Sequence, residues 1–169
     1  MIPFELTPEH FAVLGRITAT FATLEHLVHY NIGFFLDSDP WIGQIVCAPL
    51  GFPRALDVLD ALVRYRTTDQ EVIAALQSSL RTAANAAEAR NQLVHSRWYT
   101  DFVGHAANTA TRVKVGIRRG AGVQEKTETL EMTELQSIAD RLEAAVYEMS
   151  SLWEKLARAG LLKGVKFLN

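Results

Sequence analysis

The chain contains a single cysteine, Cys47, so an intrachain disulfide cannot form and no cysteine-based zinc site is present. Its 17 lysines and arginines against 19 aspartates and glutamates give a net charge of −2, which provides no general attraction to nucleic acid or anionic lipid. A glycine-rich phosphate loop, a Walker motif, a Gly-x-Ser-x-Gly motif and a zinc finger are all lacking. Any contact with nucleic acid must therefore come from a local patch of the surface.

Long apolar runs are also missing. The N-terminus lacks the basic region and apolar run of a secretory signal peptide, and no uninterrupted run approaches the roughly 20 residues that span a bilayer. Together with the single cysteine, these absences predict a cytoplasmic protein that does not associate with membranes. A length of 169 residues suits one domain with a sizeable core, so we expect residues 1–169 to fold as a single domain.

Four segments have apolar residues three or four positions apart, the spacing of amphipathic helices. We expect these helices at about residues 8–36, 53–67, 69–95 and 135–160. Thr7 suits the N-cap of the first helix, and Gly160 suits the C-terminal end of the fourth. Capping-box patterns at 68–71 and 133–136 mark the starts of the last two. Residues 40–52 hold two prolines and two glycines, and they are expected to form a loop with room for one helical turn.

The region between the last two helices has the pattern of a β-hairpin. Residues 112–118 alternate polar and apolar side chains, and residues 123–130 suit a return strand after a turn at 119–122. We therefore predict an all-α, four-helix up-and-down bundle with a β-hairpin inserted at about 108–130. The hairpin is locally basic, through Arg112, Lys114, Arg118, Arg119 and Lys126. These cations either contact a nucleic-acid backbone or protect the strand edges against aggregation.

Three polar residues stand together near the end of the third predicted helix, namely Arg90, Asn91 and His95. On a helix, Asn91 and His95 share a face, whereas Arg90 lies about 140° around the axis from His95. An arginine fork matches phosphate oxygens, an amide can orient a neighbour or bind phosphate, and a histidine can move protons near neutral pH. The alternative is structural: the same residues tie helices together, with Arg90 paired to a carboxylate such as Glu25 or Glu88.

This arrangement resembles the HEPN superfamily, which is built on an all-α bundle. Nuclease members of that family carry an arginine, then a polar residue, and a histidine four to six positions after the arginine, on a late helix. Arg90, Asn91 and His95 match those positions. The resemblance implies a metal-independent endoribonuclease of the toxin or phage-defence type. Its site would be composed across a homodimer, with RNA as substrate and a cognate antitoxin as partner. It assigns catalysis to Arg90 and His95, with Asn91 assisting.

A metal site is the remaining possibility weighed from the sequence. Glu25 and His29, four residues apart on the first helix, offer two ligands, whereas a complete site needs three or four. No second ligand pair with helical spacing accompanies them, so neither a metal nor another cofactor is expected. If the chain is not catalytic, we expect a helical bundle that binds a nucleotide, an RNA or a protein partner through the same residues.

Overall fold

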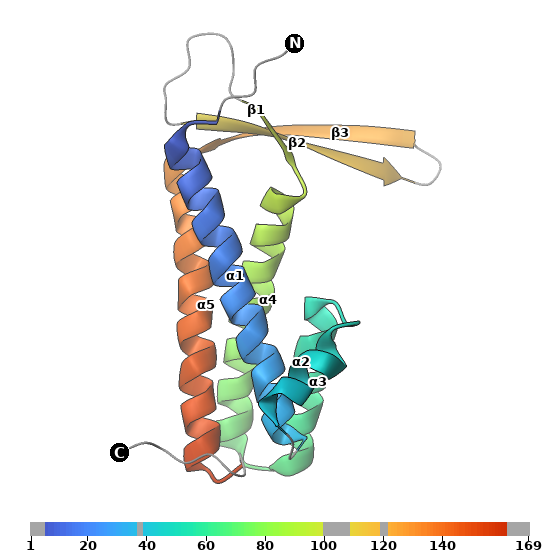
Figure 1. The fold of residues 1–169 in the computed structure, drawn as a ribbon, viewed down its shortest axis with the longest axis vertical. Helices are drawn as coiled ribbons and strands as arrows, with labels where there is room; N and C mark the ends of the chain where they lie inside the picture. Colours follow the sequence, from blue (N-terminus) through green and yellow to red (C-terminus); the bar gives the residue numbers. More distant parts are fainter. Residues whose placement is uncertain (1–5, 37–38, 100–108, 119–121, 162–169) are drawn as a thin grey trace.

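The computed structural model describes residues 6–36, 39–99, 109–118 and 122–161. This part of the chain forms five helices and a small three-stranded antiparallel sheet (Figure 1). The elements, in chain order, are α1 (Pro8–Phe35), α2 (Pro40–Cys47), α3 (Phe52–Arg66), α4 (Gln70–Val94), β1 (Arg97–Tyr99), β2 (Thr109–Arg118), β3 (Gly122–Glu131) and α5 (Met132–Arg158). Figure 1 shows α1, α4 and α5 as long helices, the shorter α3 beside their lower part, and the sheet across the upper end.

The ends of the helices are set by capping residues. Thr7 caps α1, its side chain accepting a hydrogen bond from the backbone N–H of His10, as the sequence predicts. The two capping boxes were placed slightly wrongly. Asp69, rather than Thr68, caps α4 by accepting hydrogen bonds from the backbone N–H groups of Glu71 and Val72. A Glu131–Glu134 box begins α5. Gly160, with a φ of 71°, follows the last turn of α5 in the left-handed conformation expected of it.

The direction of α3 differs from that in the up-and-down bundle that the sequence predicts. Phe52, at the start of α3, packs against Phe21 in the middle of α1, and Arg66, at the end of α3, donates a hydrogen bond to the carbonyl of Phe35. The helices α1 and α3 therefore run in the same direction. The reason is α2, which occupies part of the expected 40–52 loop and leads the chain back along α1 before α3 begins (Figure 1).

The prolines and glycines of this segment are compatible with a helix because of where they stand. Pro40 follows the N-cap Asp39, at a position where a helix needs no N–H donor. Gly43 faces α1 so closely that an added Cβ would lie 1.9 Å from the carbonyl oxygen of His29. Cys47 is buried on the same side, whereas Trp41, Ile42, Ile45 and Val46 are exposed.

The core lies between α1, α3, α4 and α5, and its largest fully buried side chains include Ile17, Leu24, Leu93, Leu142 and Met149. The α1 helix contacts all four other helices. By length and composition alone it could also cross a membrane. A membrane-spanning helix is not expected from the sequence, because the apolar residues of α1 are interleaved with small polar ones. A core helix passes the same test, so this property does not separate the two environments.

The sheet has the order β1-β2-β3. The two strands of the predicted hairpin are confirmed, although β2 begins earlier, at Thr109. Of the expected turn at 119–122, residues 119–121 lie outside the described residues and Gly122 begins β3. Across the hairpin, Ala110 faces Leu130, Arg112 faces Glu128 and Lys114 faces Lys126. Because alternate residues point to one face, these six side chains share a face, and its inner part is buried.

Candidate functional site

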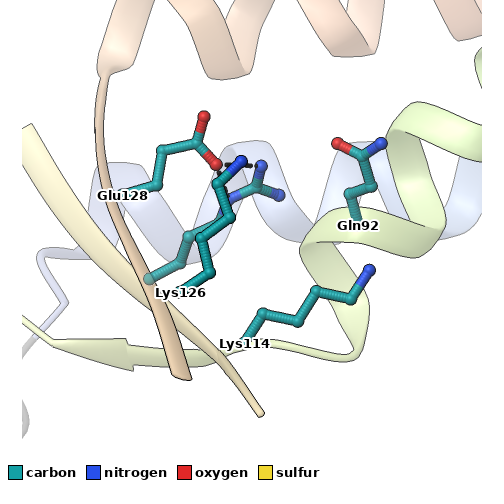
Figure 2. Close-up of a pocket in the computed structure, with 5 residues that line it drawn as sticks. Gln92, Lys114, Lys126 and Glu128 are labelled. Atoms are coloured by element: carbon teal, nitrogen blue, oxygen red, sulfur yellow. Dashed lines mark hydrogen bonds and ion pairs between the residues drawn. The ribbon is translucent and has the colours of Figure 1, made fainter. Parts of the chain in front are cut away.

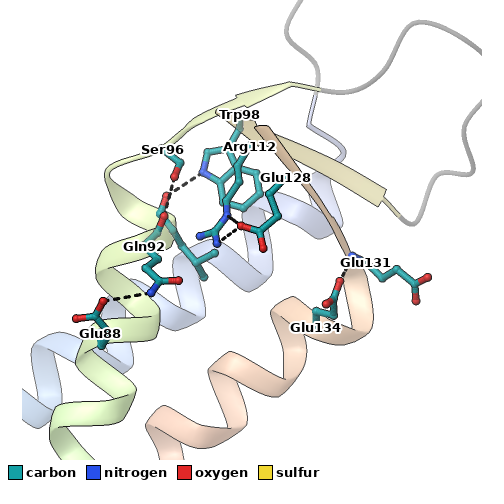
Figure 3. Close-up of polar contacts among 9 residues, drawn as sticks. Glu88, Gln92, Ser96, Trp98, Arg112, Glu128, Glu131 and Glu134 are labelled. Carbon is teal, nitrogen blue, oxygen red and sulfur yellow. Dashed lines mark hydrogen bonds and ion pairs between the residues drawn. The ribbon is translucent and has the colours of Figure 1, made fainter. Parts of the chain in front are cut away.

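The C-terminal end of α4 carries the three residues that the sequence singles out. His95 is the C-cap of the helix, and the chain then turns through Ser96 into β1. The last carbonyls are satisfied locally. The Ser96 hydroxyl donates to the carbonyl oxygen of Gln92 at 2.6 Å, and Trp98 Nε1 donates to that of Leu93 at 3.2 Å (Figure 3). The carbonyls of Gln92 and Leu93 at this helix end are therefore already used.

Arg90 is half-buried and directed toward α1. Its Nη1 donates to Oδ1 of Asn91 at 2.9 Å, and its Cζ lies 4.5 Å from the centroid of the Phe21 ring. Phe21 in turn packs edge-on against Phe52 of α3, with ring centroids 5.1 Å apart. The guanidinium is thus fixed by an amide on one side and by an aromatic face on another. Its Nε is buried without a hydrogen-bond partner.

His95 stands apart from this pair. Its side chain is exposed, and its ring makes no hydrogen bond to any described residue. Within the described chain, Asn91 bonds to Arg90 and not to His95. The structural alternative allowed an ion pair of Arg90 with Glu25 or Glu88, which is not formed among the described residues. Glu88 instead accepts a bond from Gln92 Nε2 at 3.2 Å. The chain therefore joins Arg90 to Asn91 but leaves His95 separate from them.

A small hollow lies beside this helix end, under the hairpin (Figure 2). Its volume is about 140 Å³, and it is lined by Gln92 of α4 and by Arg112, Lys114, Lys126 and Glu128 of the hairpin. Figure 2 shows Gln92, Lys114 and Lys126 extending into the same space. Sequence reasoning found the three cations as a basic hairpin but missed Gln92 and Glu128. The signal that could have found Glu128 is the hairpin register, which places it opposite Arg112.

Arg112 and Glu128, which both line the hollow, are hydrogen-bonded to each other (Figure 3). Arg112 Nε donates to Glu128 Oε2 at 3.0 Å, and Nη2 donates to the same oxygen. These bonds hold the pKa of Glu128 below its usual value, against a smaller opposing effect of burial. Arg112 is buried, with a relative exposure of 9%, and its Nη1 has no hydrogen-bond partner. The buried guanidinium therefore keeps one unused donor group.

The described residues contain no group of three or more histidine, cysteine, aspartate or glutamate side chains that could hold a metal ion. His29 is buried, and its Nδ1 lies 3.2 Å from Oε1 of Gln44 in α2. Gln44 also reaches His26 Nδ1, at 3.0 Å. His26 and His29 of α1 thus fix α2 against α1.

No protein-family model, no curated protein and no solved structure matches this chain. The resemblance to HEPN proteins accordingly rests on Arg90, Asn91 and His95 and on the helical arrangement alone.

Proposed function

We propose that the protein is a metal-independent endoribonuclease of the toxin or phage-defence type, acting in the cytoplasm. The observation that carries the proposal is the exposed, unbonded ring of His95 at the same helix end as the fixed guanidinium of Arg90. An exposed imidazole can exchange protons with a substrate, and a fixed arginine fork is suited to phosphate oxygens. The neighbouring basic hollow adds positive charge near the same end of α4.

The chemistry needs one proton removed and one supplied. A base takes the proton of an RNA 2′-hydroxyl, the 2′-oxygen attacks the adjacent phosphorus, and the bond to the 5′-oxygen breaks. The products are a 2′,3′-cyclic phosphate and a 5′-hydroxyl, whose proton comes from an acid. A single His95 cannot be base and acid at the same moment. Two copies of His95, one from each subunit of a homodimer, would supply both roles.

Arg90 would stabilise the additional negative charge on the phosphate during this reaction. In one subunit its guanidinium is turned toward Phe21 and does not bond to His95. A two-fold arrangement of α4 ends would bring the arginine and histidine of different subunits to one phosphate. We propose that α1, α3, α4 and α5 are the four helices of a HEPN-like bundle. It departs from the expected up-and-down arrangement in that α1 and α3 are parallel. A cognate antitoxin would then cover the α4 ends.

The half-buried state of Arg90 supports a second candidate function. Its bond to Asn91 and its place on the Phe21 ring are what a structural arginine would show. In that case the chain is a non-catalytic helical bundle that binds a nucleotide, an RNA or a protein partner. The two candidates differ in whether His95 matters for cleavage.

Cleavage of a mixed, structured RNA in excess EDTA separates them. We expect the wild type to cleave, and His95→Ala and Arg90→Ala to lose at least about 100-fold of that activity, the contribution typical of acid–base groups. Matched controls are His26→Ala, an exposed histidine of α1, and Arg81→Ala, an exposed arginine of α4. Equal cleavage by all five proteins, or none by the wild type, would remove the catalytic reading and favour the binding bundle.

A further inference from the structure

The hollow under the hairpin has a charge that its surroundings do not balance. Three basic side chains line it, Arg112, Lys114 and Lys126, against the single carboxylate of Glu128. Glu128 is engaged with Arg112. Neither lysine forms an ion pair within the described part of the chain. Both lysines are exposed, and the hollow therefore keeps their positive charge beside the buried guanidinium of Arg112.

The register of the hairpin places the two lysines where their charges repel and lower its stability. Lys114 and Lys126 are directly opposite one another on neighbouring strands, and like charges in that position destabilise a hairpin. Both are exposed, but they lie on the same face of the hairpin as Ala110 and Leu130, which are buried. Lysines that only protect a strand edge would not need to share this inner face.

Arg112 provides an independent sign of a binding site. It is nine-tenths buried, lines the hollow, and has its Nη1 buried without a hydrogen-bond partner. Buried donors are nearly always satisfied, so an orphaned guanidinium nitrogen needs an explanation. An anion beside the two lysines would accept from this donor and from the Gln92 amide as well.

We propose that the hollow lined by Gln92, Arg112, Lys114 and Lys126 binds a phosphate group of a single-stranded RNA backbone. An RNA occupant is favoured because Gln92 lies three residues before His95, so the hollow and the histidine flank one helix end. A strand held there by one phosphate would pass a neighbouring phosphate to His95. This inference deepens the proposed function and rests on it for the identity of the substrate.

Binding of a fluorescent single-stranded RNA in EDTA, followed by anisotropy, tests the hollow separately from cleavage. The test variant is Lys114→Gln/Lys126→Gln, which leaves the buried Arg112 and its bond to Glu128 unchanged. Its matched control is Lys155→Gln/Arg158→Gln, which removes two exposed charges from the far end of α5 (Figure 1). We expect the Kd of the test variant to rise about tenfold or more and that of the control less than twofold. The slope of log K against log[salt] should become shallower by about 0.7, the contribution of one lost phosphate contact with a single strand.

The substitution Lys114→Glu separates function from stability. It converts the opposed lysines into an opposite-charge pair, so the melting temperature should stay equal or rise. RNA binding should nevertheless weaken at least as much as in the double variant. All binding measurements are repeated on a His95→Ala background, so that cleavage does not consume the RNA. A wild type that does not cleave RNA, but still binds it through the lysines, would count against the nuclease and not against the hollow.

Three results would overturn the inference. Unchanged RNA binding by the test variant would show that the hollow does not hold the strand. Equal weakening by the test and control variants would show that binding depends only on total charge. Competition by inorganic phosphate is expected for a phosphate site. Binding of an acidic polyglutamate peptide without binding of RNA would assign the hollow to a protein partner and contradict the RNA assignment.

Discussion

At the scale of single residues, His10 links the fold to pH. It is fully buried at the start of α1, with Nδ1 2.8 Å from the Thr7 hydroxyl and Nε2 without a partner. Burial lowers its pKa from the ordinary value of 6.5, and the neighbouring charge of Glu9 opposes this only in part. Protonating the ring inside the fold would place a charge where water cannot reach it.

This burial predicts that the folded state loses stability in acid. Because the folded pKa is the lower one, the unfolded chain binds a proton more readily once the pH falls below about 6.5. The free energy of unfolding should decrease as the pH falls from about 6.5 toward the pKa of His10 in the folded state. Below that pKa, the contribution of His10 should no longer change with pH. Urea unfolding of wild type and His10→Gln between pH 7.5 and pH 4.5, a range that spans the free-histidine value, measures the difference. Parallel pH curves for the two proteins would show that His10 has no such role.

At the scale of elements, the contact of α2 with α1 depends on one glycine. A Cβ at Gly43 would lie 1.9 Å from the carbonyl oxygen of His29 and 2.7 Å from the backbone nitrogen of Gly33. Both are main-chain atoms of α1, so relief requires the whole of α2 to move. The exposed apolar side of α2 has no part in this contact.

Substitution of Gly43 by alanine should therefore destabilise the protein, by about 1–3 kcal/mol, the usual cost of an overpacked contact. Gly15→Ala is the matched control, because Gly15 lies inside α1 with nothing within 4 Å of the added Cβ. There the better helix propensity of alanine should raise stability by about 0.5–1 kcal/mol. Denaturant unfolding measures both changes. Similar effects in the same direction would mean that the α1–α2 contact is not as tight as described.

Elements defined by local signals were predictable, and those defined by distant contacts were not. The helices beginning at Pro8 and Gln70 follow from their caps and apolar spacing, and the hairpin strands follow from alternation. The helix α2 was missed because glycine and proline favour loops, whereas here Gly43 serves a close packing contact. The strand β1 was missed because three residues, Arg97–Tyr99, become a strand only by pairing with β2.

The candidate site also has a part that the sequence predicts and a part that depends on distant contacts. Arg90, Asn91 and His95 are recognisable in the sequence because they lie within one short segment of a helix. The cation–π contact of Arg90 with Phe21 joins α4 to α1, which no spacing rule foretells. The hollow likewise needs the hairpin register to place Lys114 opposite Lys126 and the fold to bring both to Gln92.

At the scale of the whole molecule, the proposed reaction requires two copies of the chain. We expect a particle of twice the 18.8 kDa chain mass in sedimentation equilibrium. Cleavage activity per chain should fall on dilution below the dissociation constant of the dimer, because each reaction would use histidines from both subunits. A monomer that retains full activity per chain at every concentration would contradict the composite site.

The chemical identity of the cleaved RNA ends tests the central claim most directly. In excess EDTA, mass spectrometry of the products from the wild type should find 2′,3′-cyclic phosphate ends paired with 5′-hydroxyl ends. His95→Ala, checked to be folded, should produce neither. Ends with a 3′-hydroxyl and a 5′-phosphate, or cyclic phosphate formed equally by the variant, would contradict proton transfer by His95 to and from the ribose oxygens.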